Sequence, residues 1–340
     1  MYFNTLEKLS PLKLKLLNKA FFKDIVGSYG DISTLSKLER EYISNTIPFT
    51  SLELEKLLED EESKTYKALF KLHDGKLVES VLMRFTDGRN SVCVSSQVGC
   101  PVGCIFCASG AMGFMRNLTS NEIVDQVMFW ARWLKDKKYE GKTRVSNIVF
   151  MGMGEPMLNY ANVVECLKVF TSEDEFGLGD RHITVSSSGY IRQLRSFMKE
   201  GLKTRLAISL HAPNQELREK LMPVAKIYSL NDLMAFIKEW EDYSHKRVSY
   251  EYTMIDNVND SSKDAWELVK LMKNRLAHIN LIPLNPIMER EDLKKSSRNR
   301  IFAFHDILKS ANIPVTIRIT MGDRIQAACG QLANKNKLQN

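Results

Sequence analysis

Apolar residues recur at helical spacing in the first part of the chain. Leu12, Leu16 and Ala20 repeat every four positions with lysines between them, and this period predicts an amphipathic helix. Shorter stretches over 36–43 and 51–58 are further helical candidates. We therefore expect a small helical domain over residues 1–64, whose lysines would form a basic surface.

The apolar period changes to two after residue 64. Residues 66–72 and 77–85 flank an Asp74-Gly75 turn, the arrangement of a β-hairpin. This hairpin would form a linker over 65–90, and residues 91–96 would form the next strand.

Strands and helices alternate through the rest of the chain, which predicts an α/β fold. Repeated strand–helix units give a parallel sheet with right-handed crossovers. We predict a full or partial β/α barrel over 91–333, with its chemistry at the carboxyl ends of the strands, and a polar tail over 334–340. The expected strands are 145–151, 182–186, 206–210, 248–254, 278–282 and 315–319, and the expected helices are 120–134, 160–171, 191–199, 230–243, 262–274 and 298–310.

Composition and charge narrow the class of protein. The chain has 340 residues, of which 44% are hydrophobic and 26% charged, as in ordinary globular proteins. No apolar run approaches the roughly 20 residues that span a bilayer, and the N-terminus does not resemble a signal peptide, so we expect a cytoplasmic protein. The net charge of +7 permits a nucleic-acid partner without establishing one.

Three of the six cysteines, Cys100, Cys104 and Cys107, lie within eight positions. In a chain without an export signal, such clustering indicates metal binding or catalysis. Three thiolates on one loop suit a 4Fe-4S cluster in which one iron lacks a cysteine. The C-x3-C-x2-C loop after a first barrel strand is the signature of radical S-adenosylmethionine (SAM) enzymes. The alternative is a zinc knuckle completed by a distant His or Cys.

Glycine and polar motifs follow the later strands. Each has a plain structural explanation, such as a turn, a helix cap or a structural histidine. Together, at successive strand ends, they favour a SAM site. The residues concerned are Gly154, Glu155, Ser187, Ser209, Leu210, His211 and Asn285.

Two further cysteines are candidates for chemistry. Cys93 lies on the strand before the cysteine loop. Cys329 lies after the last strand in a segment of small residues, a location that favours an accessible, nucleophilic thiol. Cys166 has the apolar surroundings of a buried, inert thiol.

Four segments carry a specific resemblance to a known family. They are Cys93-Val94-Ser95-Ser96-Gln97-Val98-Gly99-Cys100, Met151-Gly152-Met153-Gly154-Glu155, Ser209-Leu210-His211-Ala212-Pro213 and Ala327-Ala328-Cys329-Gly330-Gln331-Leu332. These segments closely resemble the RlmN/Cfr family of radical SAM RNA methyltransferases, which methylate adenine carbons. The resemblance covers nearly the whole chain.

The resemblance implies a role for each matching residue. Cys100, Cys104 and Cys107 would bind one 4Fe-4S cluster, and the strand-end motifs would bind SAM, used twice per turnover. Cys329 would take a methyl group from one SAM, and a radical made from the second would join that methyl carbon to adenine. Cys93 would then form a disulfide with Cys329 and release the product, and Glu79 would be the proton acceptor.

The family divides between methylation at adenine C2 and at adenine C8, the latter conferring antibiotic resistance. Pro156 after Glu155, and Pro283-Leu284 before Asn285, resemble the C2 branch. Its substrates are 23S rRNA at the peptidyl transferase centre and the adenine next to the anticodon of certain tRNAs. A low-potential electron donor such as flavodoxin or ferredoxin is implied, and we expect a monomer without membrane attachment.

Some positions depart from the family's usual pattern. Arg324 and Gln326 replace residues that are often acidic, and Ala225 and Ile227 interrupt a basic stretch. These departures put the substrate range in doubt more than the reaction type. A metal-stabilised RNA-binding protein without catalysis is the alternative from another class.

Overall fold

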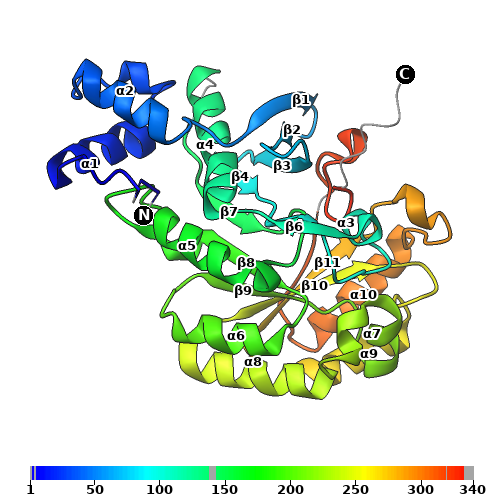
Figure 1. The fold of residues 1–340 in the computed structure, drawn as a ribbon. Coiled ribbons are helices and arrows are strands. Elements are labelled where there is room, and N and C mark those ends of the chain that lie inside the picture. Colours follow the sequence, from blue (N-terminus) through cyan, green and yellow to red (C-terminus); the bar gives the residue numbers. More distant parts are fainter. Residues whose placement is uncertain (1, 4, 138–142, 319, 333–340) are drawn as a thin grey trace.

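The computed structural model (Figure 1) describes residues 2–3, 5–137, 143–318 and 320–332. The predicted polar tail over 334–340 lies outside these residues. In the part of the chain that is described, no helix has the length and apolar character needed to cross a bilayer.

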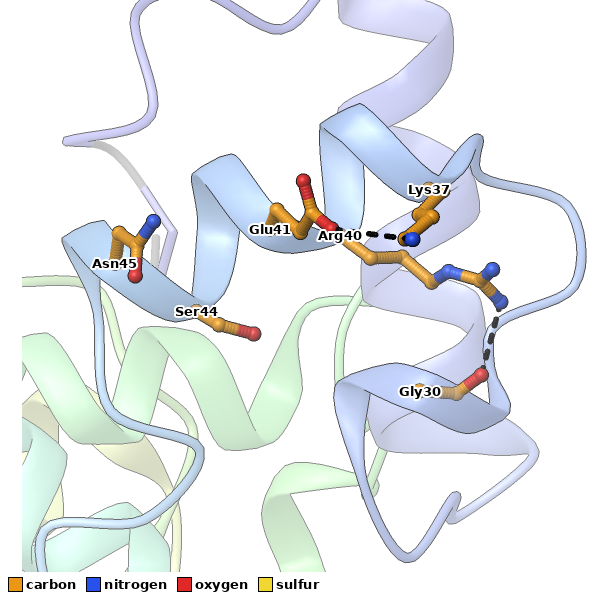
Figure 2. Close-up of a pocket in the computed structure, with 6 residues that line it drawn as sticks. All are labelled: Gly30, Lys37, Arg40, Glu41, Ser44 and Asn45. Atoms are coloured by element: carbon orange, nitrogen blue, oxygen red, sulfur yellow. Dashed lines mark hydrogen bonds and ion pairs between the residues drawn. The ribbon is translucent and has the colours of Figure 1, made fainter.

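The N-terminal region contains the first predicted helices. α1 (Pro11–Asn18) is capped by Ser10, and α2 (Lys37–Thr46) begins with a capping box at Ser36, so side chains satisfy the exposed amides of each first turn. Beside α2 is a pocket in which Arg40 donates to the carbonyl of Gly30 at 2.9 Å (Figure 2). An aromatic cluster lies among these elements, formed by Tyr2, Phe3, Phe21, Phe22, Tyr29 and Phe49.

A buried carboxylate attaches this region to the rest of the molecule. Asp125, on α4 (Ser120–Asp136), accepts a hydrogen bond from the Tyr2 hydroxyl at 2.6 Å. It also accepts from the backbone N and the Oγ of Ser51, each at 2.7 Å. Burial raises the pKa of Asp125, and these hydrogen bonds oppose that rise. The three donors satisfy a group that would be costly to bury unpaired.

Ten strands form one sheet, in the order β1-β2-β3-β4-β7-β8-β9-β10-β11-β12. The first three are antiparallel neighbours and β3 pairs antiparallel with β4, whereas the strands from β4 to β12 run parallel. β1 and β12 are its edges among the described residues, so the parallel part is an open, partial β/α barrel, as predicted. The strands are β1 (Glu53–Asp60), β2 (Thr65–Lys71), β3 (Leu77–Arg84), β4 (Asn90–Cys93), β7 (Asn147–Phe150), β8 (Ile183–Ser187), β9 (Arg205–Ser209), β10 (Val248–Met254), β11 (Ala277–Pro283) and β12 (Val315–Ile317).

The helix predicted over 51–58 is wrong, because this segment forms strand β1. Leu, Glu and Lys favour a helix on intrinsic propensity, yet the backbone pairs with β2, with Leu57 opposite Ala68. The register shifts between Leu54 and Lys56, which marks a bulge. Pairing with a neighbouring strand has overridden local preference, and the exposed glutamates and lysine suit an edge strand.

Six predicted crossover helices are present and three elements were missed. The confirmed helices are α4, α5 (Tyr160–Thr171), α6 (Ile191–Lys199), α8 (Leu230–Ser244), α9 (Ser262–Met272) and α10 (Arg298–Ser310). The elements that were not predicted are α3 (Ala108–Met112), α7 (Gln215–Leu221) and a small sheet that pairs β5 (Gln97–Gly99) with β6 (Phe114–Asn117). α3 and α7 are short, and they lie near the carboxyl ends of the strands, where Figure 1 also places the C-terminal segment in red beside α3.

Strands β4, β8, β10 and β11 are buried over most of their length, which is typical of strands covered on both faces, whereas the edge strand β12 is partly exposed. Within β10 and β11, apolar residues such as Tyr250 and Ile279 are fully buried, and so are the polar residues Glu251, Thr253 and Asn280. Buried polar groups require partners. Glu251 and Asn280 lie at the middle of their strands, and Thr253 lies near the carboxyl end of β10. The buried polar groups therefore reach from the strand centres to the carboxyl ends, where the site motifs follow.

Candidate active site

The three clustered cysteines lie on one loop between β5 and α3. Cys107 N donates to the carbonyl of Cys104 at 3.2 Å, and Ile105 N donates to the carbonyl of Leu221 at 3.1 Å. The second contact seats the loop on the end of α7. Cys100, Cys104 and Cys107 are partly buried and pack against a separate apolar cluster under this loop.

The three thiols share one electrostatic environment. Burial raises the pKa of Cys100 to about 12 and holds that of Cys104 well above its usual value, and the Cys107 thiol adds to both rises. Among the described residues, no three His, Cys, Asp or Glu side chains converge tightly enough to hold a single metal ion. Metal binding must displace protons from such thiols. Three thiols on one short loop, two of them desolvated, fit a three-cysteine donor set for an iron–sulfur cluster.

Gly154 and Glu155 lie where the segment after β7 approaches the β4–β5 connection. Gly154 has φ +100°, and a Cβ added to it would lie 2.5 Å from the Cβ of Gln97. Only glycine fits this approach without displacement. Glu155 N donates to Gln97 Oε1 at 2.8 Å, which fixes the backbone beside the cysteine loop.

The Glu155 carboxylate is buried and fully oriented. One oxygen accepts from Met157 N at 3.0 Å, and the other accepts from the N and the Oγ of Ser188, each at 2.7 Å. Burial raises the pKa of Glu155, while the Ser188 hydrogen bonds and a weaker one from Ser187 oppose the rise. The sequence singled out Ser187, whose Oγ accepts from Gly189 N at 3.1 Å, but Ser188 makes the shorter contacts with Glu155.

Ser209, Leu210 and His211 follow one another at the end of β9. The backbone N of both Leu210 and His211 donates to the carbonyl of Glu251, at 3.0 and 3.2 Å. His211 Nδ1 accepts from Thr253 N at 2.9 Å, and burial, with Arg218 nearby, lowers the pKa of His211 to about 3. The ring is therefore neutral and carries its proton on Nε2.

The segment that carries Cys329 is held by contacts from distant parts of the chain. Asn285 Nδ2 donates to the carbonyl of Cys329 at 3.0 Å, and Ala108 N donates to the carbonyl of Gly330 at 2.8 Å. Gly322 N donates to Ser63 Oγ at 3.1 Å. Arg324 forms an ion pair with Glu62. The predicted SAM-site residue Asn285 thus contacts the segment that carries Cys329.

Cys93 and Cys329 are brought together from opposite ends of the barrel sequence. Burial raises the pKa of Cys93 to about 12, and the Cys329 thiol adds to that rise. Cys329 remains exposed, although the atoms packed around its thiol raise its pKa. All six cysteines are free thiols in the structure, so the predicted disulfide is not formed in this state.

Arg318 and Glu251 lie beside both thiols. Arg318 is within hydrogen-bonding reach of Cys329 and lowers its pKa, whereas the Glu251 charge raises it. Glu251 Oε1 accepts from Asn280 Nδ2 at 2.8 Å. Its Oε2 lies 3.8 Å from Arg318 Nε and has no hydrogen-bond partner. A cation next to a thiol favours the thiolate, so Arg318 favours nucleophilic Cys329.

Glu79 is held in a buried ion pair on the other side of the Cys329 segment. Its carboxylate lies 3.0 Å from the Nζ of Lys67, and both side chains are almost fully buried. Lys67 Nζ also donates to the carbonyl of Gln326 at 3.0 Å. One lysine therefore joins the predicted proton acceptor to the segment carrying Cys329.

Sequence reasoning missed several charged residues that the fold places in the site. Lys67, Glu251 and Arg218 interrupt apolar strands or a short helix, and Arg318 follows β12. A charged residue inside an otherwise apolar strand is a signal, since such residues are rarely buried unless paired. Which residues they would meet depends on contacts between distant segments.

Comparisons with known proteins identify the family to which the chain belongs. The profile of the radical SAM superfamily matches residues 94–272. A probable dual-specificity RNA methyltransferase RlmN of Symbiobacterium thermophilum is 42% identical over 323 residues, which cover 95% of this chain and 85% of the relative. A protein of the same description from Bacillus thuringiensis is 44% identical over 317 residues, covering 93% and 85%.

A solved structure extends the likeness to the fold. A radical SAM methyltransferase from Sphaerobacter thermophilus superposes with a TM-score of 0.92 at 38% identity, covering 96% of this chain and 94% of its own. The cysteine loop and the motifs at Gly154-Glu155, Ser187 and Ser209-Leu210-His211 lie in the region matched by the superfamily profile, and Asn285 lies beyond it. The chain belongs to the radical SAM superfamily and, within it, to the RlmN/Cfr family of RNA methyltransferases.

Proposed function

We propose that this enzyme methylates C2 of adenine in 23S rRNA and in tRNA, with Cys329 carrying the methyl group. The observation that carries the proposal is the meeting of Cys93 and Cys329 beside Arg318. Two thiols, one buried and one exposed, suit a carrier cysteine that must reach substrate and a second cysteine reserved for thiol exchange.

Cys100, Cys104 and Cys107 would hold a 4Fe-4S cluster, and the strand-end residues would hold SAM. Glu155 would bind the ammonium group of SAM, because it is a buried carboxylate, oriented by hydrogen bonds, at the mouth of the barrel. Ser187, Ser209, Leu210, His211 and Gly154 would complete the surface around SAM, with Asn285 between it and Cys329. When bound, the cluster supplies the electron that cleaves SAM and so generates the radical that activates the methyl carbon.

The chain's own residues then have separate tasks. Cys329, favoured as thiolate by Arg318, takes a methyl group as the methyl–sulfonium bond of SAM breaks. Glu79, positioned by Lys67, accepts the proton lost from the adenine adduct. Cys93 attacks the sulfur of Cys329, so that a disulfide forms as the bond from that sulfur to the methylene carbon breaks. Reduction of the disulfide restores both thiols.

The C2 position and the RNA substrates rest on finer features. Pro156 and the Pro283-Leu284 pair match the C2 branch, and relatives are described as dual-specificity RNA methyltransferases. Of the departures, Arg324 pairs through its side chain with Glu62 and so would help to hold the Cys329 segment. Gln326 contributes its backbone carbonyl to Lys67, a contact that does not depend on its side chain. Ile227 is exposed, where it would affect RNA contact.

The accessory regions have proposed roles as well. Residues 1–64 would form an RNA-binding helical domain, 65–90 a hairpin linker and 91–333 the catalytic core of a cytoplasmic monomer. Several N-terminal lysines already have protein partners, such as Lys13 with Glu39 at 3.3 Å and Lys15 with Asp174 at 3.7 Å. Flavodoxin or ferredoxin would supply electrons.

Nucleoside analysis tests the proposal. Mass spectrometry of 23S rRNA and tRNA from cells with and without the protein should give 2-methyladenosine that depends on it. The sole appearance of 8-methyladenosine would support the C8 alternative instead. Anaerobic purification should give about four irons per chain, whereas bound zinc without SAM cleavage would indicate a non-catalytic RNA-binding protein.

A further inference from the structure

Arg218 is a cation buried in the site without a carboxylate partner. It lies on α7 and is fully buried, with 0% of its surface exposed. Its Nη2 donates to the carbonyl of Ser188 at 2.6 Å and to that of Ser209 at 3.3 Å. Its Nε is buried and has no hydrogen-bond partner. In the described part of the chain, no Asp or Glu forms an ion pair with it.

Burying a guanidinium group without a carboxylate partner costs free energy unless a bound anion neutralises its charge. Two carbonyl oxygens offer dipoles but no net charge, and buried charges in proteins are paired or ligand-bound. The Arg218 Nε can donate one more hydrogen bond, and no described residue accepts it. Arg218 therefore points to a bound anion.

The position of Arg218 identifies that anion. The two carbonyls that accept from Arg218 lie at the ends of β8 and β9. On the same helix, the carbonyl of Leu221 accepts from Ile105 N of the cysteine loop at 3.1 Å. Leu217 and Leu221, on the same helix as Arg218, pack in the apolar cluster that also contacts Cys100, Cys104 and Cys107. Arg218 thus faces the cysteine loop from the side of the barrel mouth, while Lys220 on the same helix is exposed and pairs with Glu216 at 2.7 Å.

We propose that Arg218 is the counter-cation of the iron–sulfur cluster held by Cys100, Cys104 and Cys107, and that it stabilises the reduced cluster. The inference rests on the proposed function, since it needs that cluster. A cluster ligated by three thiolates carries net negative charge, and one-electron reduction adds another negative charge. Net charge, hydrogen bonds and solvent exposure set cluster potentials. A fixed cation at a site screened from water acts most strongly on the more negative state.

The test is an EPR-monitored redox titration of the reconstituted enzyme without SAM. In R218Q the cluster should be harder to reduce by at least tenfold in the equilibrium constant, which for one electron is about 59 mV. R218K, which keeps the charge, should stay nearer the wild-type potential. The matched control K220Q removes a charge from the same helix at the surface, and it should leave the potential unchanged.

The outcomes separate this inference from the proposed function. If the wild-type protein binds no iron–sulfur cluster, the proposed function fails first. If the wild type and R218Q hold equal iron at equal potential, Arg218 is not the counter-cation and the inference fails alone. An unchanged potential with weakened SAM binding would also overturn it, because Arg218 would then serve the SAM carboxylate.

A second comparison keeps the inference testable if R218Q does not take up the cluster. R218M fills similar space without a polar group, so it separates charge from hydrogen bonding. Loss of iron in R218Q and R218M with retention in R218K would show that cluster assembly needs the positive charge. Loss in all three variants would contradict the inference, because charge would then not be the property that matters.

Discussion

Replacing Arg318 should slow the reaction of Cys329 with an alkylating reagent. Packing around the thiol raises the pKa of Cys329, and Arg318 is the cation that opposes this rise. A neighbouring opposite charge moves a pKa by about 1–3 units. Because the Arg318 side chain is 37% exposed, water screens its charge and we use the lower end. Without Arg318 the pKa of Cys329 should rise by about one unit, and at a pH below the pKa this leaves about one-tenth of the wild-type thiolate.

Replacing Glu251 should act in the opposite direction. The Glu251 charge raises the pKa of Cys329 and offsets the charge of Arg318. In E251Q the pKa of Cys329 should therefore fall, and the thiol should react faster than in the wild type at the same pH. Opposite changes in the labelling rate of Cys329 in R318Q and E251Q are a stricter test than a slower rate in one variant alone.

The assay is iodoacetamide labelling of anaerobically purified enzyme without SAM, followed by mass spectrometry of the Cys329 peptide across neutral to alkaline pH. The wild-type rate should keep rising above pH 9, because the pKa of Cys329 is raised above its usual value of 9.0. Cys166, which is fully buried, reports unfolding in the same sample. Equal Cys329 rates in the wild type, R318Q and E251Q at every pH would refute the reasoning.

Three further outcomes follow from the site. C93A should accumulate a covalent protein–RNA adduct, visible as a band that survives denaturing electrophoresis, and clean turnover by this variant would contradict the exchange role of Cys93. K67M removes the cation of a buried ion pair, which should lower the free energy of unfolding by about 3–5 kcal/mol; urea unfolding should show a smaller loss in K67M/E79L, and equal losses would contradict the coupling. C166A should methylate RNA at the wild-type rate, and loss of activity in this folded variant would mean that Cys166 is not a bystander.

Regular elements with a strong period were predictable from the sequence. Residues 248–254 alternate or remain apolar between turn signals, and β10 has these bounds. The helices α5, α6 and α10 also begin and end where the pattern predicted. Ser297 caps the start of α10, whereas α5 and α6 begin without a side-chain cap, so their apolar period alone set the prediction. The helix prediction over 51–58 failed because these helix-forming residues pair with β2, a contact that the local sequence does not reveal.

The site was predictable as a set of motifs but not as a set of contacts. Cysteine spacing and glycine placement are local properties, so the loop and the Gly154-Glu155 turn can be read from the chain. The pairing of Glu79 with Lys67 lies within the predicted hairpin, whereas that of Arg318 with Glu251 depends on the sheet order that places β12 near β10.

The open edge of the barrel bears on how RNA enters. The segment over 320–332 is held by Lys67, by Ser63 and by backbone groups near α3, and it contributes no strand to the ladder. Moving it outward therefore breaks a few separate hydrogen bonds, whereas parting β10 from β11 would break a continuous ladder. Local opening of this segment would widen access to the already exposed Cys329 while the barrel stays intact, and its amides should exchange with solvent faster than those of β10.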